Sequence, residues 1–161
     1  MKHLPKHLQP RWRYLAVEIE THPKEDISRD AFQTALWQAA RALVGDAGSA
    51  TIGLTVVRFR QYDGGNEAVV RCYRGTVDRA RAVIACVDRV GSTPIGVRVR
   101  GTSGTIRACE EKYLGRAHVK TEERTVVFDG EERTAVVRPP RVDLREGSTY
   151  VGATDLDFQH E

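Results

Sequence analysis

Residues 97–115 are predicted to form a strand, a glycine-rich turn and a helix, and their residue types suit the binding of an anion. Arg98 and Arg100 lie two positions apart, so their side chains point to the same face of the strand. The turn at 101–105 leaves backbone N–H groups free at the start of a helix, where phosphate oxygens bind well. The expected contacts here are Arg98, Arg100, Gly101, Ser103, Gly104, Thr105 and Arg107. The glycines have a plainer alternative role, because they also permit a sharp turn.

Catalytic chemistry has little support in the same segment. Glu110 and Glu111 are adjacent, so their side chains diverge by about 100° on a helix, and Arg107 is placed to pair with Glu111 one turn away. Ser103 lacks a Gly-x-Ser-x-Gly elbow and is expected to cap the helix instead. Neither a Walker motif nor a GxGxxG fingerprint surrounds the glycines. The sequence therefore predicts no catalytic residue and no nucleotide cofactor.

The cysteines and histidines do not form a metal-binding pattern. Cys72, Cys86 and Cys109 are odd in number and widely separated, which fits neither a zinc knuckle nor a disulfide framework. Only His3 and His7 have helical ligand spacing, and they lie in a proline-bearing segment that is not expected to be helical. We expect reduced cysteines and no metal held by the protein.

Charge is distributed unevenly along the chain. Residues 1–121 contain 20 Lys or Arg and 12 Asp or Glu, whereas residues 122–161 contain 5 and 10. Of the 25 basic residues, 20 are arginine, whose planar fork binds phosphate and guanine well. The first part therefore favours a nucleic-acid partner, although an arginine-rich composition can also be a lineage preference. No secretory signal or membrane-spanning run is apparent, so a cytoplasmic location is expected.

Hydrophobic periodicity predicts six elements in order before the glycine turn. They are a strand over 11–20, a helix from Ser28 to Gly45, strands over 53–62 and 66–74, a helix capped by Thr76 and ending before Gly91, and a strand over 95–100. The turn Asp63-Gly64-Gly65 predicts an antiparallel hairpin between the second and third strands. The order predicts an α+β fold of the RRM-like or ferredoxin-like split βαβ (βαββαβ) type, an antiparallel sheet with helices on one face.

The other face of this sheet is predicted to be rich in arginine and tyrosine. If Leu15, Val17 and Ile19 point toward the helices, Thr55, Val57 and Phe59 do so too. The outward-facing set is then Arg58, Arg60, Tyr62, Arg71, Tyr73, Arg98 and Arg100. Such a face suits stacked bases and phosphates of RNA. A third helix over 105–114 can fold over it, however, and RNA would then contact the sheet edge and the glycine turn.

Two domains are expected, an RRM-like RNA-binding domain at 1–121 and an acidic extension at 122–161. Asp129-Gly130 predicts a hairpin over 124–138. Pro139-Pro140 is expected to end regular structure, and the last 20 or so residues are expected to form a loosely ordered tail.

Three stretches resemble one known family. Residues 99–107 with 110–114, residues 10–19 and residues 35–48 are similar to archaeal ribonuclease P protein component 2, a family shared with a eukaryotic ribonuclease P/MRP subunit. The resemblance covers about residues 3–118 and leaves the acidic extension without a clear counterpart. It implies a non-catalytic, RNA-binding subunit of the complex that removes the 5′ leader from precursor tRNA.

The resemblance also implies the partners. They are the catalytic ribonuclease P RNA, which would hold Mg²⁺, precursor tRNA reached through the complex, and the protein component 3, with a homodimer of this chain as a further possibility. One alternative remains open, a ferredoxin-like regulatory module that binds a small carboxylate or phosphate effector. An acylphosphatase-type enzyme is a weaker alternative, because no Gly-x-x-Gly-x-x-Arg loop follows the first strand.

Overall fold

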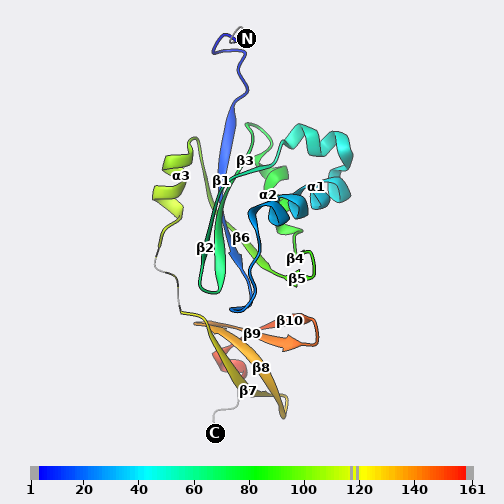
Figure 1. The fold of residues 1–161 in the computed structure, drawn as a ribbon, viewed down its shortest axis with the longest axis vertical. Coiled ribbons are helices and arrows are strands. Elements are labelled where there is room, and N and C mark those ends of the chain that lie inside the picture. Colours follow the sequence, from blue (N-terminus) through cyan, green and yellow to red (C-terminus); the bar gives the residue numbers. More distant parts are fainter. Residues whose placement is uncertain (1–3, 117, 119, 159–161) are drawn as a thin grey trace.

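Two antiparallel four-stranded sheets, joined end to end, form the body of the molecule (Figure 1). The computed structural model describes residues 4–116, 118 and 120–158. The first sheet has the strand order β2-β3-β1-β6 and the second has the order β10-β9-β8-β7. The mixed α+β class with antiparallel sheets is confirmed. Within the described ranges, no helix has the length and apolar character needed to cross a membrane.

The first sheet and its helices follow the predicted order, with one small insertion. Its elements are β1 (Trp12–Glu20), α1 (Arg29–Ile52), β2 (Thr55–Tyr62), β3 (Gly65–Tyr73), α2 (Val77–Ala85), the short β4 (Arg89–Val90) and β5 (Thr93–Pro94), β6 (Gly96–Ser103) and α3 (Ile106–Tyr113). β2 and β3 form the predicted antiparallel hairpin. α1 and α2 cover one face, where Leu15, Val17 and Ile19 are fully buried together with Phe32 and Leu36.

The helix ends differ in part from the prediction. Ser28 caps α1 as expected, because its hydroxyl oxygen accepts from the Ala31 N–H at 3.1 Å. Gly45 only interrupts the helix, with φ 72° and ψ 176°, and the helix resumes and ends before Gly53. Thr76 occupies the N-cap position of α2 as predicted, but its side chain makes no capping hydrogen bond, since its hydroxyl donates to the Tyr73 carbonyl at 2.8 Å. Gly91 lies in the turn between β4 and β5 rather than at the end of α2.

An irregularity in β2 changes the predicted facing of two residues. The pairing register of β2 with β3 shifts between Val56 and Arg58, which is a β-bulge. Val56 is therefore buried against the helices, and Val57 lies on the opposite face. The prediction that Thr55 and Val57 face the helices was wrong, because sequence alternation alone does not reveal a bulge. Phe59 packs against the helical core as predicted.

The third helix lies on the sheet face opposite α1 and α2 (Figure 1). Cys109 of α3 is fully buried against Ala16 and Val69, with Tyr113 packed at the edge of the same small cluster. The arginine-rich face is thus covered at its centre by α3.

The acidic extension is folded along most of its length. The predicted hairpin is present as β7 (Glu122–Phe128) and β8 (Glu131–Arg138). The expectation of a loosely ordered tail was wrong for the described residues, which form β9 (Arg141–Glu146), β10 (Thr149–Thr154) and the short η1 (Asp155–Asp157). Pro139-Pro140 makes a turn rather than an end. The final three residues of the predicted tail lie outside the described residues.

This second sheet has its own small hydrophobic core. Its strands are short, and their charged residues make the apolar alternation hard to recognise in the sequence. Ala135, Val137, Val142 and Leu144 are buried together. In β9 the two apolar residues alternate with Arg141, Asp143 and Arg145, so pairing with β8 is what buries them. We call β7–β10 the C-terminal sheet.

Candidate nucleic-acid interface

The glycine-rich segment at 101–105 does not form the predicted turn with free backbone N–H donors. β6 continues through Ser103, and Gly101 and Ser103 lie in register with Ala16 and Tyr14 of β1. The cap of α3 is Thr105 rather than Ser103, because the Thr105 hydroxyl oxygen accepts from the Ala108 N–H at 3.1 Å. Only Gly104 and Thr105 remain between the strand and the helix. The segment extends the edge strand and begins a helix, so the expected cradle of donors is not assembled.

Gly101 has a packing role instead. A Cβ atom at this position would lie 2.2 Å from the Cε1 atom of Tyr113, so the ring rests directly on the backbone of β6. The absence of a side chain therefore lets α3 approach the sheet closely. Of the predicted donor set, Arg107 lies on the outer side of α3, with its side chain 87% exposed and paired with Glu111 at 2.7 Å, as predicted.

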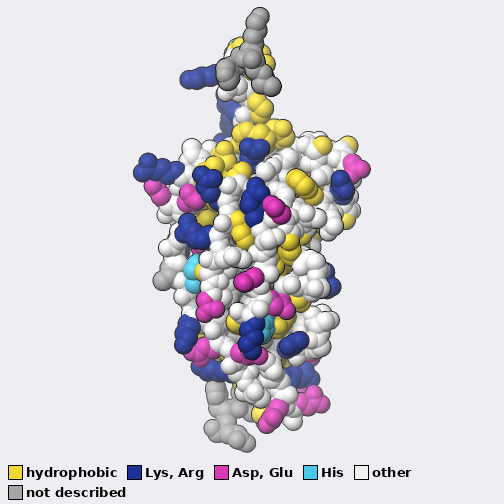
Figure 2. Space-filling view, in the orientation of Figure 1, with side chains coloured by type: hydrophobic (Ala, Val, Ile, Leu, Met, Phe, Trp, Pro, Cys, Tyr) yellow, Lys and Arg dark blue, Asp and Glu magenta, His cyan; other side chains and the backbone are white. Residues whose placement is uncertain are grey.

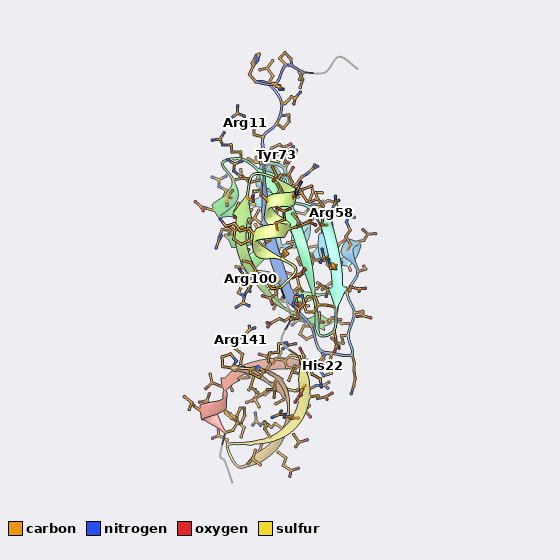
Figure 3. All side chains as sticks on the ribbon, turned by 90° about the vertical axis from the view of Figure 1, so that its left-hand side faces the viewer. Arg11, His22, Arg58, Tyr73, Arg100 and Arg141 are labelled. Carbon is orange, nitrogen blue, oxygen red and sulfur yellow. The ribbon has the colours of Figure 1, made fainter. Side chains whose placement is uncertain are left out.

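The predicted arginines do share one sheet face, as their pairing shows. Arg58, Arg60 and Arg71 stand on the α3 side of β2 and β3, and Arg98 and Arg100 stand on the same side of β6. α3 divides them into groups. Figure 3, which faces this side, shows Tyr73 beyond one end of α3, Arg58 beside it, and Arg100 between α3 and the C-terminal sheet.

At one end of α3 lies an aromatic platform made by Trp12, Arg71 and Tyr73. The Trp12 and Tyr73 rings stack with centroids 4.3 Å apart, and the Arg71 guanidinium lies 4.1 Å from the Trp12 ring centroid. The Arg71 Nε atom is buried without a hydrogen-bond partner. The platform offers flat rings next to a cation, a combination that stacks bases. Trp12 was not among the predicted site residues, although it alternates with Tyr14 on this face of β1.

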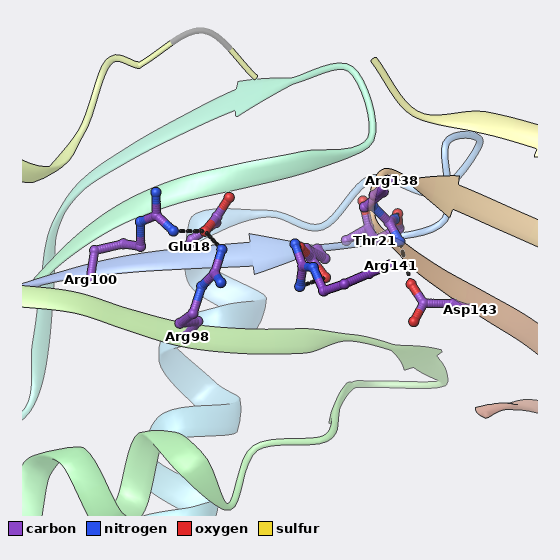
Figure 4. Close-up of polar contacts among 8 residues, drawn as sticks. Glu18, Thr21, Arg98, Arg100, Arg138, Arg141 and Asp143 are labelled. Atoms are coloured by element: carbon purple, nitrogen blue, oxygen red, sulfur yellow. Dashed lines mark hydrogen bonds and ion pairs between the residues drawn. The ribbon is translucent and has the colours of Figure 1, made fainter. Parts of the chain in front are cut away.

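At the other end of α3, Arg98 and Arg100 share one carboxylate. Arg98 Nη2 lies 2.7 Å and Arg100 Nη1 lies 3.4 Å from Oε2 of Glu18 (Figure 4). Burial opposes ionisation of Glu18, but the hydrogen bond and charge of Arg98, with the charges of Arg100 and Arg141, outweigh it and lower the pKa of Glu18. Glu18 therefore stays ionised and orients both guanidinium groups. Glu18 also neutralises part of the charge of Arg98 and Arg100. The predicted outward-facing set did not contain this carboxylate.

Arg58 and Arg60 stand beside α3. Arg58 Nε lies 3.9 Å from Glu110 Oε1, and the Arg58 side chain is 62% exposed. Arg60 is exposed and pairs in register with Glu67. The space-filling view sees this side edge-on and shows Lys, Arg, Asp and Glu side chains along the left-hand edge of the molecule, where α3 lies (Figure 2).

Reactive groups are sparse on this surface. Cys109 is buried, and burial raises the pKa of its thiol to about 11, so it is not an activated nucleophile. Cys72 is also buried, and all three cysteines are free. Among the described residues, no group of three His, Cys, Asp or Glu side chains is placed to hold a metal ion.

Similar proteins agree with the resemblance seen in the sequence. A protein from Halorubrum lacusprofundi named ribonuclease P protein component 2 is 58% identical over 159 residues, which cover 99% of this chain and all of that protein. A protein of the same name from Haloarcula marismortui is 55% identical and is also fully covered. One from Methanobrevibacter smithii is 33% identical over 116 residues, which are 69% of this chain and 95% of that protein.

The family model of the Rpp14/Pop5 family matches residues 13–114, from the start of β1 to the end of α3. The matched region contains the whole first sheet and all of its helices. The C-terminal sheet lies outside it. The chain therefore belongs to the Rpp14/Pop5 family.

Proposed function

We propose that this chain is a non-catalytic, RNA-binding subunit of ribonuclease P. It would support the catalytic RNA in removing the 5′ leader from precursor tRNA. The observation that carries the proposal is the arginine and tyrosine face around α3, in a chain of the Rpp14/Pop5 family whose relatives are named ribonuclease P protein component 2. The effector-binding alternative has no support from these relatives.

The physical role follows from charge. Folding a large RNA brings phosphates close together, and guanidinium groups reduce their repulsion, so the RNA needs less Mg²⁺ to fold. The Mg²⁺ ions would be held by the RNA, and catalysis would belong to the RNA. The candidate contacts are Arg58, Arg60, Arg71, Tyr73, Arg98, Arg100 and Arg107. Six arginine–phosphate contacts would give a slope of log K against log salt of about −4 to −5.

The sheet arrangement supports an RRM-like assignment, with one change in where RNA would bind. The strand order β2-β3-β1-β6, with α1 and α2 on one face, is consistent with the split βαβ connections of that fold. Because α3 covers the centre of the other face, RNA would contact the aromatic platform and the arginines around α3 instead of the middle of the sheet.

The proposed partners are those that the resemblance to ribonuclease P protein component 2 implies. They are ribonuclease P RNA, protein component 3 and, through the complex, precursor tRNA, and a homodimer is also proposed. A cytoplasmic location accords with this role.

RNA binding by the full chain tests the proposal. The affinity for the cognate ribonuclease P RNA should fall steeply with salt, and replacing Arg98, Arg100 and Arg107 with glutamine should flatten the slope by about one for each lost contact. A matched control replaces three exposed arginines on the α2 side, Arg79, Arg81 and Arg89. If the two triple variants bind RNA equally, the proposed face is wrong.

A further inference from the structure

A groove crosses the junction between the two sheets. Residues of both the family-matched region and the C-terminal sheet line it. It has a volume of about 300 Å³. Its floor is formed by Arg98 and Arg100 of β6, one side by Arg116 after α3, and the other by Arg138 and Arg141 of the C-terminal sheet. Five arginines and three glutamates line it, so its formal charge is positive. Figure 3 shows Arg100 and Arg141 facing this junction from the two sheets.

The side made by the segment after α3 is held in place by a buried carboxylate. Glu67, only 5% exposed, accepts from the Gly115 N–H at 3.2 and 3.4 Å through its two oxygens. The His118 ring stacks on Tyr62 with centroids 3.4 Å apart. These contacts fix the chain on both sides of Arg116 against the first sheet.

The opposite side is held by arginines that cross between the sheets. Arg138 donates to the Thr21 carbonyl at 2.6 Å and to Asp143 at 2.5 Å. Arg141 donates to both oxygens of Glu20, at 2.5 and 3.3 Å (Figure 4). The groove is therefore formed before any ligand arrives, which lowers the entropic cost of binding.

Several guanidinium donors remain free in the groove. Arg98 bonds Glu18 through Nη2 alone, and a guanidinium has five N–H donors. Arg116 is exposed, and in the part of the chain that the structure describes no carboxylate lies within 4.0 Å of it. Free guanidinium forks at fixed positions suit phosphate oxygens.

The C-terminal sheet contributes positive charge to the groove. Outside the groove lining, Arg124 is paired with Glu122, and Arg133 is paired with Glu131 and Glu146. Arg138 and Arg141 are the two arginines that reach the first sheet. Of the residues that the structure shows lining the groove, those from the C-terminal sheet include Arg138 and Arg141 and no acidic residue.

We propose that this groove binds the phosphodiester backbone of RNA, so that the acidic extension enlarges the RNA-binding surface instead of shielding it. This inference rests on the proposed function. RNA that leaves the arginines beside α3 would continue over Arg100 and Arg116 to Arg141.

The test compares two double variants of the full chain in binding to the cognate RNA over a range of salt concentrations. R116Q/R141Q removes two groove arginines, and R124Q/R133Q removes two arginines of the C-terminal sheet that do not line the groove. The groove double variant should bind more weakly, with a slope of log K against log salt shallower by about one for each lost contact. The control should match the wild type. Because Arg141 also contacts Glu20, thermal unfolding checks both variants, and R116Q alone decides if the double variant is unfolded.

The outcomes separate the two proposals. If wild-type binding depends on salt but R116Q and the groove double variant match the control, the groove proposal is overturned and the subunit proposal stands. If the wild type binds the RNA without any salt dependence, or fails to bind it, the subunit proposal itself is overturned and the groove proposal with it.

Discussion

Single residues on the α3 face set how much positive charge it offers. Alternation along the strands was enough to place Arg58, Arg71 and Arg98 on one face. The carboxylate that Arg98 and Arg100 share belongs to Glu18, 80 positions before Arg98 in the chain. Such long-range pairs depend on which strands are neighbours, so the sequence alone predicted the arginines but not their neutralisation.

Replacing Glu18 with glutamine should strengthen RNA binding and weaken the fold. Arg98 and Arg100 would lose their counter-charge, so the affinity should rise at low salt and the salt slope should steepen. The ion pair is partly exposed, so its loss should lower the free energy of unfolding by about 1 kcal/mol. RNA titrations and urea unfolding at neutral pH measure both effects, and weaker RNA binding would contradict this account of Glu18.

Acid should remove the stability that Glu18 contributes. The folded state lowers the pKa of Glu18 below 4.5, so the contribution is complete above the unfolded pKa and is lost as the pH falls through the folded pKa. The difference in unfolding free energy between the wild type and E18Q should therefore shrink as the pH drops below 4.5. A difference that stays constant with pH would assign it to packing rather than charge.

Stacking and charge should be separable at the aromatic platform. Tyr73→Leu removes a ring that stacks on Trp12 at 4.3 Å but removes no charge. A base stacked there would lose about 1–3 kcal/mol, so RNA affinity should fall by roughly 5- to 150-fold with an unchanged salt slope. Equal affinity of a folded Y73L variant would exclude the platform as a base contact.

At the scale of elements, the order of strands and helices was predictable, but the local irregularities were not. The apolar repeat of α1, the Asp63-Gly64-Gly65 turn and the alternation of β1 are strong local patterns. The β-bulge near Val57 depends on the pairing of β2 with β3. At Gly45 the sequence predicted the end of the helix but not that the helix resumes after the break. Gly101 likewise looked like part of a turn and instead accommodates Tyr113.

The packing of α3 on β6 gives a direct test at the scale of elements. Gly101→Ala places a Cβ atom 2.2 Å from the Tyr113 ring, so α3 must move and the protein should lose about 1–3 kcal/mol. Gly96→Ala on the same strand is the matched control, because its Cβ atom would lie 3.6 Å or more from its neighbours. Urea unfolding and hydrogen exchange of the α3 amides measure the difference. Equal stability of the two variants would contradict the packing role of Gly101.

At the scale of the whole molecule, the acidic extension was predictable as a separate region but not as a folded sheet. Its net charge and Asp-Gly turn were visible in the sequence. The apolar residues of β9 alternate with charges, and β10 is a short strand with few apolar residues, so only the pairing of β9 with β8 and of β10 with β9 reveals them as strands. The arginines that join the two sheets likewise depend on tertiary contacts.

Arg138 should be the main polar link between the sheets. Its side chain is 10% exposed and holds both the Thr21 carbonyl and Asp143. Arg138→Met leaves both acceptors without this donor and should cost about 3 kcal/mol, whereas Arg145→Met on the same sheet should cost little. Calorimetry and hydrogen exchange of the β8–β10 amides compare the stability of the two variants. Burial raises the pKa of Asp143, so the penalty should be smaller in acid, where Asp143 is protonated and needs no cation.

Reconstituted cleavage of precursor tRNA tests the central claim most directly. The cognate catalytic RNA and component 3 are assayed over a range of Mg²⁺ concentrations, with and without this chain. A non-catalytic subunit that neutralises phosphates should shift cleavage to lower Mg²⁺ while leaving the position of the cut unchanged. The same Mg²⁺ dependence with and without the chain would contradict the account.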